Sequence, residues 1–319
     1  AITFTNKAAN EMKSRAESMI GERARDVRLS TFHSFCARIL RADIESTGFR
    51  KKSFVIYDVS DARALIRTII KEFKLDEMLF NPASVQSAIS SVKNNLLNAN
   101  EFFDRILLNS KSKDHDKKLA QIYQVYEKRM IENNAVDFDD LLLLAVRMLE
   151  KFPDIREKYQ RKFQYILIDE YQDTNLAQYQ LSKLLAAAHH NICVVGDADQ
   201  LESVGAGSVF RELIASRIAP VTVLDQIFRQ AKDSLVAYNA RYVNEGRGEL
   251  LYGDDFRFIR ADTQAEVAEL IRGLYREEIK RVGIDQVMIL SPFRSTGDAC
   301  ANALNQSLRD EARQAGKIL

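Results

Sequence analysis

The chain has 319 residues, with 46 basic and 45 acidic side chains and a formal net charge of +1. This balance excludes a uniformly basic surface, so any contact with nucleic acid must come from a local patch. Three cysteines without metal-ligand spacing, and the lack of an apolar run long enough to cross a bilayer, predict a reduced, cytoplasmic protein with no membrane contact.

The first part of the chain predicts short strands alternating with helices. Residues 2–5 have the pattern of the end of a buried strand, residues 7–20 carry apolar side chains at helical spacing, and residues 27–31 indicate a second short strand. Residues 50–133 are almost wholly helical in pattern, so we expect a separate helical subdomain there. Within it we expect Asp61 to cap a helix and residues 109–117 to form a mobile loop.

Two later segments are apolar at every position. Residues 165–168 and 191–195 therefore predict strands buried on both faces of a parallel sheet, and residues 177–188 predict the crossover helix between them. The pattern returns as predicted strands at residues 221–224 and 286–290, with a helix at 265–281 between them. The fold class is therefore predicted to be α/β with a helical insertion.

Acidic and amide side chains follow the first two of these apolar strands. Asp169 and Glu170 close one strand, and Gln200 follows the other after two aspartates. Because ligands bind beyond the carboxyl ends of parallel strands, we expect these groups to share one site. One carboxylate can hold Mg²⁺ through its waters while its neighbour orients an attacking water. Acids at a single strand end more often cap the next helix or turn, but two such ends with Arg229 in the same chain favour phosphate chemistry.

Four segments, in order along the chain, are similar to motifs of the UvrD/Rep/PcrA branch of the superfamily 1 DNA helicases. Residues 168–175 (IDEYQDTN) resemble the Walker B element of that family, and residues 3–9 (TFTNKAA) resemble its motif Ia. Residues 31–35 (TFHSF) resemble motif Ib, and residues 136–142 (VDFDDLL) resemble the segment that returns from the helical insertion of these proteins.

After Gly196 the chain is more similar to the RecD/TraA branch of the same superfamily. Residues 196–201 (GDADQL), 227–231 (IFRQA) and 289–294 (ILSPFR) carry this likeness. The two branches translocate in opposite directions, so the resemblance leaves the direction open, with a weak preference for 3′ to 5′ from the first half.

The resemblance implies a fold with three parts. Residues 1–50 and 134–220 would form an incomplete RecA-like parallel-sheet motor domain, without the strand and loop of the Walker A element. Residues 51–133 would form an all-helical insertion, and residues 221–319 would form part of a second RecA-like motor domain.

The resemblance also implies the role of each polar residue at the strand ends, with ATP and Mg²⁺ as cofactors. Asp169 would bind Mg²⁺, and Glu170 would be the general base for ATP hydrolysis. Gln200 would sense the γ-phosphate, and Arg229 would be an arginine finger from the second motor domain. In other NTPases such an arginine raises the rate by about 10³–10⁵.

The same likeness places the loops of motifs Ia and Ib on single-stranded DNA. Backbone contacts and aromatic stacking hold single strands without base preference. From the residues alone, a phenylalanine near a strand end belongs to the protein core more often than to a stacking surface. The predicted contacts with single-stranded DNA, and with DNA duplex junctions as substrate, are Thr3, Phe4, Thr5, Asn6, Phe32 and His33.

No glycine-rich Gly-Lys-Thr phosphate loop occurs in the sequence, although the family carries one shortly before motif Ia. We therefore expect a chain truncated at both ends, inactive alone, from an ATP-dependent DNA helicase of replication, repair or recombination. The alternative is a non-catalytic module that binds DNA or a partner protein through a degenerate helicase fold, in which the acids would be structural.

Overall fold

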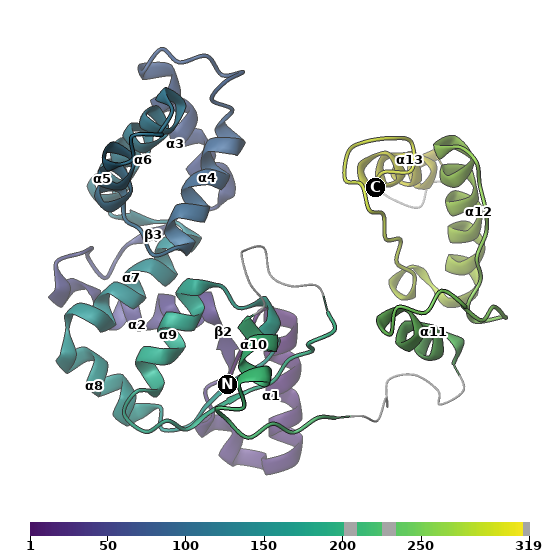
Figure 1. Ribbon diagram of the computed structural model, residues 1–319, viewed down its shortest axis with the longest axis horizontal. Helices are drawn as coiled ribbons and strands as arrows, with labels where there is room; N and C mark the ends of the chain where they lie inside the picture. The colour runs from purple at the N-terminus through teal and green to yellow at the C-terminus, as the bar shows by residue number, and fades with distance from the viewer. Residues whose placement is uncertain (201–208, 225–233, 315–319) are drawn as a thin grey trace. The chain divides into compact units, whose positions relative to one another are not determined.

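The structure is a computed structural model that describes residues 1–200, 209–224 and 234–314. The chain divides into two compact units, Ala1–Thr222 and Val223–Leu319, each with its own packing (Figure 1). In the described ranges, no helix combines the length and the apolar character that a bilayer-spanning segment requires.

The first unit is built on a four-stranded parallel sheet with the strand order β2-β1-β5-β6. Ile2 of β1 pairs with Ser30 of β2 and with Ile168 of β5, and Ile168 also pairs with Val194 of β6. The predicted parallel sheet is therefore confirmed. Its strands are β1 (Ile2–Thr3), β2 (Ser30–Thr31), β5 (Ile166–Ile168) and β6 (Ile192–Val194).

Burial differs between the two strands that were predicted to be covered on both faces. Ile168 in β5 is fully buried, as expected, whereas Ile192 in β6 is 40% exposed. The prediction was wrong for β6, because among the described residues this strand lies at the edge of the sheet with a neighbour on one side only.

Helices around the sheet supply most of the core of the first unit. The central helix α7 packs against both α2 and α9, and side chains such as Ile39, Val146 and Leu181 fill the space between them. The helices of this part are α1 (Asn6–Ile20), η1 (Gly21–Asp26), α2 (Phe32–Thr47), α7 (Phe138–Lys151), α8 (Pro153–Lys162), η2 (Tyr171–Asp173), α9 (Leu176–Ala186) and α10 (Val209–Ser216).

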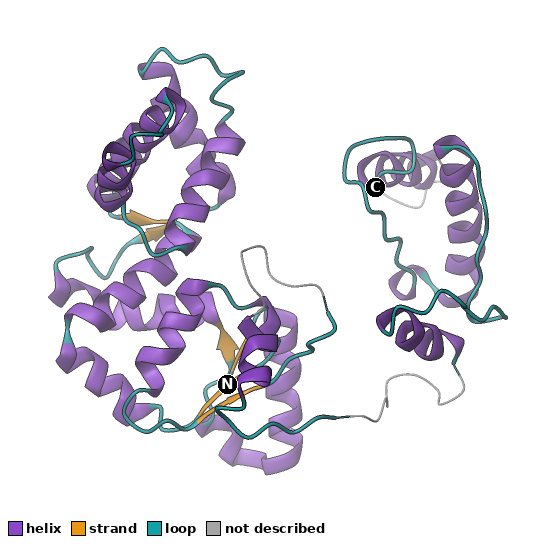
Figure 2. Cartoon of the chain, in the orientation of Figure 1, coloured by secondary structure: helices purple, strands orange, loops and turns teal. Residues whose placement is uncertain are grey.

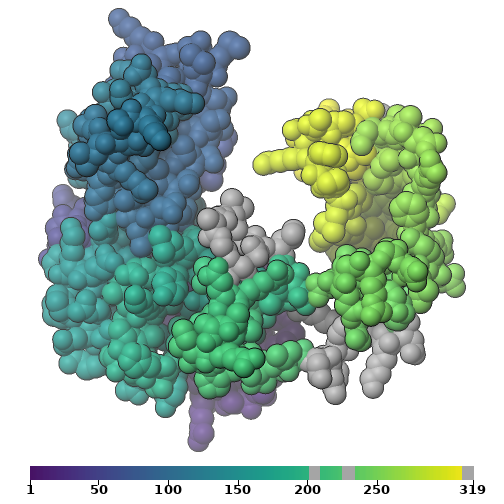
Figure 3. Space-filling view, viewed as in Figure 1, coloured from purple at the N-terminus to yellow at the C-terminus, as the bar shows by residue number. Residues whose placement is uncertain are grey.

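A helical insertion lies between α2 and α7 in the chain and has its own core, which includes Ile66, Ile89, Tyr123 and Met130. A two-stranded parallel sheet of β3 and β4 lies at its base (Figure 2), and the helices form a separate lobe of the first unit (Figure 3). Its elements are β3 (Val55–Ile56), α3 (Val59–Glu72), α4 (Pro82–Asn94), α5 (Ala99–Leu108), α6 (Asp114–Glu132) and β4 (Ala135–Val136).

Two local predictions in the insertion were wrong. Asp58, not Asp61, caps α3: its Oδ1 accepts from the backbone N of Asp61 at 2.8 Å, and Asp61 returns the bond as the partner in a capping box. The predicted loop at residues 109–117 is shorter than expected, because α6 begins at Asp114 and the Asp116 carboxylate accepts from the backbone N of Lys113 at 3.1 Å.

The second unit is described as helices around a small core of Ala268, Ala299 and Leu304. The helix predicted at residues 265–281 is confirmed as α12. The helices are α11 (Leu235–Asn244), α12 (Gln264–Val282), η3 (Ile284–Gln286) and α13 (Ala301–Gln314).

The strands predicted at residues 221–224 and 286–290 are not formed in the described backbone. Leu224 is 87% exposed and Leu290 is 83% exposed, so these apolar segments lie on the surface. A strand forms only beside a partner that takes up its backbone hydrogen bonds, and no described segment pairs with either of these two.

Candidate functional site

The backbone at the end of β5 is held on both sides by its neighbours. The N–H of Asp169 donates to Ile2 O at 3.0 Å, and the N–H of Tyr171 donates to Val195 O at 2.9 Å. The hydrogen-bonded ladder therefore continues past the strand. It fixes the positions from which the half-buried Asp169 and Glu170 side chains project.

Glu170 has a left-handed backbone conformation, with φ 53° and ψ 44°. For a residue with a Cβ this conformation costs roughly 1–2 kcal/mol. It turns the chain sharply from β5 into the short helix η2. The Tyr171 ring that follows is buried and packs edge-on against Phe210, with ring centroids 5.9 Å apart, which helps to hold the turn. Strain of this kind is typical of functional sites.

A buried amide joins the two acid-ended strands. The Nε2 of Gln172 donates to Glu170 Oε2 at 2.8 Å and to Gln200 Oε1 at 3.4 Å, and its Oε1 accepts from the backbone N of Asp197 at 3.0 Å. Gln200 also donates to Asp197 Oδ2 at 3.3 Å. The structure thus brings Glu170 and Gln200 together through Gln172, for which the sequence predicted no role.

Gly196 is required for this close approach. A Cβ at this position would lie 2.5 Å from Gln172 Oε1 and 3.1 Å from the backbone N of Tyr171. The glycine after β6 therefore allows the amide to reach the loop that carries Gln200. A glutamine two residues after a strand-end acid, together with a glycine after the next strand, is the sequence signal that could have indicated the bridge.

Arg229, the fourth residue predicted for the catalytic set, lies outside the described residues. Its role as an arginine finger stays a prediction.

The residues predicted to contact DNA divide into buried and exposed groups. Thr3 and Phe32 are each only 1% exposed, and Phe32 packs against the half-buried Phe4 with ring centroids 5.6 Å apart. The ring of Phe32 faces the core in this structure, so it is not open to stack on a base, and its contact with DNA stays a prediction. Phe32 therefore belongs to the packing between sheet and helices, which is the core role that the residues alone favour.

Three other predicted contacts are accessible. Thr5 and Asn6 are exposed at the start of α1, where Thr5 Oγ1 accepts from the backbone N of Ala8 at 3.1 Å. His33 is half-buried and packs edge-on against Phe138, with ring centroids 5.8 Å apart. Burial lowers the pKa of His33 below its ordinary value, and the nearby Asp139 carboxylate opposes this shift. His33 is therefore expected to be a neutral hydrogen-bonding group.

The acidic segment at the start of α7 is structural. Asp137 caps the helix by accepting from the backbone N of Asp140 at 2.8 Å. Both carboxylates pair with Lys93 of the insertion, at 2.7 Å and 2.6 Å, and Lys93 is fully buried. Although burial opposes it, the charge of these two carboxylates raises the pKa of Lys93 well above its ordinary value. The ion pairs anchor α4 to α7.

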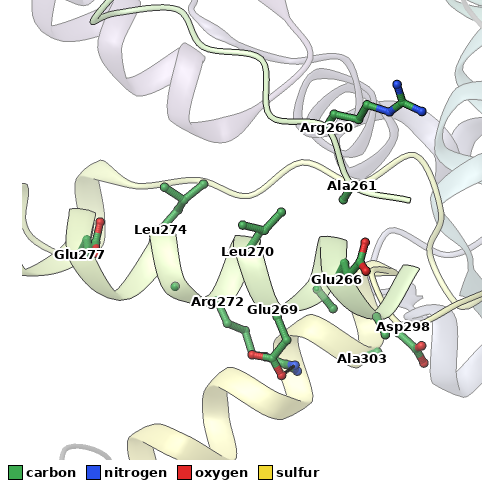
Figure 4. Close-up of a pocket in the computed structure, with 13 residues that line it drawn as sticks. Arg260, Ala261, Glu266, Glu269, Leu270, Arg272, Leu274, Glu277, Asp298 and Ala303 are labelled. Carbon is green, nitrogen blue, oxygen red and sulfur yellow. Dashed lines mark hydrogen bonds and ion pairs between the residues drawn. The ribbon is translucent and has the colours of Figure 1, made fainter. Parts of the chain in front are cut away.

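A groove of about 1010 Å³ runs along α12 in the second unit. Leu270 and Leu274 point into it from the helix, and Arg260 and Ala261 lie on the opposite side (Figure 4). Its middle is apolar, and Asp169 and Glu170 lie in the other unit.

The family of the chain follows from comparison with known proteins. Residues 1–201 match the sequence profile of the UvrD/REP helicase N-terminal domain. The chain belongs to this family. The matched range contains β1, β5, β6 and every described residue of the Gln172 bridge, so the UvrD/REP assignment rests on the part of the chain that forms the site.

The ATP-dependent DNA helicase PcrA of Bacillus subtilis (strain 168) is 43% identical over 245 residues, which cover 75% of this chain and 32% of that protein. PcrA of Staphylococcus epidermidis (strain ATCC 12228 / FDA PCI 1200) is 38% identical over 289 residues, and PcrA of Staphylococcus aureus (strain NCTC 8325 / PS 47) is 37% identical over 283 residues. Each of these two alignments covers 85% of this chain and 38% of the relative. The UvrD/REP chain thus spans between 32% and 38% of the length of these relatives.

Proposed function

We propose that this UvrD/REP-family chain is part of the motor of an ATP-dependent DNA helicase or translocase, and that it carries the hydrolytic carboxylates. The observation that carries the proposal is the Gln172 amide, which joins Glu170 to Gln200 across the ends of two neighbouring parallel strands. A residue that activates water and a residue that senses the terminal phosphate have to act on the same phosphate group, so such a link suits ATP hydrolysis.

The donor set at the end of β5 fits Mg²⁺ bound with ATP. Asp169 and Glu170 offer carboxylate oxygens, and the buried hydroxyl of Thr3, one strand away at the same level, has no hydrogen-bond partner among the described atoms. No three or more His, Cys, Asp or Glu side chains of the described residues are grouped around one metal position. Mg²⁺ does not need such a cage, because it keeps several waters and binds one or two carboxylates with substrate phosphates.

Each residue has one task in this proposal. Asp169 would hold Mg²⁺, which neutralises phosphate charge when bound. Glu170, oriented by Gln172, would accept a proton from the attacking water. Gln200 would meet the γ-phosphate and, through Gln172, link its presence to the orientation of Glu170. Arg229 would supply positive charge to the terminal phosphate.

DNA contacts are proposed for the accessible part of the predicted set. Thr5 and Asn6 at the start of α1, with His33 at the start of α2, follow the neighbouring strands β1 and β2 and offer polar groups suited to a single strand. Phe4 could add an aromatic edge. The proposed substrates are single-stranded DNA and duplex junctions, as expected for a helicase in replication, repair or recombination.

A RecD/TraA-like second half is not supported by the comparisons. The alignments to the two staphylococcal PcrA proteins cover 85% of the chain, more than the first unit contains, so the PcrA likeness reaches into the second unit. This favours a chain of one branch throughout and supports the 3′ to 5′ direction as the proposal.

The test is the Glu170→Gln variant of the full-length protein. We expect it to bind ATP and DNA but to lose ATP hydrolysis by a factor of about 10²–10⁴, the usual contribution of a general base. Glu157→Gln is the matched control, because Glu157 is an exposed acid on α8. Turnover in Glu170→Gln equal to that of the control would refute the assignment.

A further inference from the structure

Asn94, at the end of α4 in the helical insertion, bonds to two other elements of the first unit. Its Nδ2 donates to Asp139 Oδ1 of α7 at 2.9 Å, and its Oδ1 accepts from Asn175 Nδ2 at 2.7 Å. The residues are 45 and 81 positions away from Asn94 in sequence. A single amide of the insertion thus contacts both α7 and the start of α9.

Asn175 connects this amide to the turn that carries Glu170. Its Oδ1 caps α9 by accepting from the backbone N of Gln178 at 2.9 Å. Only Thr174 separates it from η2, the short helix that contains Gln172. A shift of the turn when nucleotide binds would therefore move Asn175 and its bond to Asn94.

The other partner of Asn94 lies beside the predicted DNA contact. Asp139 follows Phe138, whose ring packs against His33, and the Asp139 carboxylate acts electrostatically on the same imidazole. Asn94 is thus bonded on one side to the start of α9 and on the other to a residue beside His33.

The contact between Asn94 and Asn175 is distinct from the contacts that anchor the insertion, which are made by the neighbouring Lys93. Lys93 holds α4 to α7 through its ion pairs with Asp137 and Asp140. The Asn94–Asn175 bond instead joins α4 to α9. Removal of the Asn94 amide therefore cuts the connection to the catalytic turn and leaves the buried anchor in place.

We propose that Asn94 is a positioning residue that couples the helical insertion, and DNA held at His33, to the turn that carries Glu170. The proposal rests on the proposed ATPase function of the full-length protein. The coupling would run through the two hydrogen bonds of the Asn94 side chain, one to Asp139 and one to Asn175. DNA contact at His33 and nucleotide binding at the turn would then both act on the position of this amide.

The experiment measures ATP hydrolysis by the full-length protein with and without a single-stranded oligonucleotide. In Asn94→Ala we expect the stimulation by DNA to fall about fivefold, as for the loss of one net hydrogen bond, with basal turnover unchanged. The matched control is Asn95→Ala, because the Asn95 amide donates to Ser91 O of its own helix and should leave the stimulation unchanged.

A second variant separates coupling from capping. Asn175→Asp keeps the oxygen that caps α9 but loses the Nδ2 donor to Asn94, so it should lower the stimulation as Asn94→Ala does. Because both changes cut one link, the double variant should show no further fall. Effects that multiply in the double variant would overturn the coupling, and so would an unchanged stimulation in Asn94→Ala.

The outcome also distinguishes the two proposals. A wild-type protein whose hydrolysis does not respond to DNA would overturn the coupling and the proposed function together. Wild-type stimulation that depends on Glu170 but survives in Asn94→Ala and Asn175→Asp would overturn the coupling alone. Equal thermal unfolding midpoints of Asn94→Ala and Asn95→Ala would exclude a general loss of folding as the cause of the expected fall.

Discussion

The amide of Gln172 lies 2.8 Å from Glu170 Oε2, and the same amide accepts a hydrogen bond from the backbone N of Asp197 at 3.0 Å. The side chain is only 9% exposed. One buried glutamine thus connects the turn after β5 to the loop after β6. In the proposed reaction its task is to position Glu170 and Gln200 rather than to react.

We predict that Gln172→Met lowers ATP turnover by the full-length protein at least tenfold. Methionine keeps the length of the side chain but removes the donor to Glu170 and the acceptor for the Asp197 N–H, and each lost hydrogen bond costs about 0.5–1.5 kcal/mol. Steady-state assays measure the loss of ATP hydrolysis, and denaturant unfolding measures the loss of stability. Gln164→Met, at an exposed glutamine before β5, is the control and should change neither. Normal turnover in Gln172→Met would show that the bridge is dispensable.

We predict that Gly196→Ala displaces Gln172 and destabilises the protein by about 1–3 kcal/mol, because the new Cβ would overlap the amide oxygen and press on the backbone of Tyr171. Gly273→Ala is the contrasting control. It lies inside α12 with nothing within 4 Å of the added Cβ, so it should raise stability by up to about 1 kcal/mol. Denaturant unfolding measures the change in unfolding free energy of each variant. Equal changes in the two variants would contradict the close contacts around Gly196.

We predict that Lys93→Met destabilises the first unit by about 3–5 kcal/mol, because it leaves the buried carboxylates of Asp137 and Asp140 without their cation. Adding Asp137→Asn and Asp140→Asn to this variant should recover part of the loss. Lys128→Met, on the exposed side of α6, should have little effect. The unfolding midpoints of Lys93→Met, the triple variant and Lys128→Met are compared with that of the wild type. No recovery in the triple variant would mean that packing, not charge, holds this position.

We predict that the part of folding stability contributed by His33 decreases as the pH falls below about 6.5, the ordinary imidazole value. Burial lowers the pKa of His33, so the unfolded chain takes up a proton in this range that the folded chain resists. Unfolding free energies between about pH 5 and 7.5 should therefore decline more steeply in the wild type than in His33→Gln. Identical slopes in the wild type and His33→Gln would contradict the assigned shift.

The sequence by itself determined the elements that follow local patterns. The apolar run before Asp169 specified β5 and placed two acids at its end, and the spacing of apolar residues specified α1, α9 and α12. The parallel sheet followed from these runs and their crossover helix. These features depend on neighbours along the chain, which a single sequence displays directly.

Only the tertiary structure decided which side chains are buried and which atoms meet. The residues alone favoured a core position for Phe32 without fixing it, and its burial follows from the packed helices; β6 is exposed at the edge of the described sheet. Likewise, Gln172 reaches Gln200 across 28 residues, and Asn94 reaches Asn175 across 81. Burial and hydrogen-bond partners depend on segments brought together by folding, and a local pattern alone does not specify which segments meet.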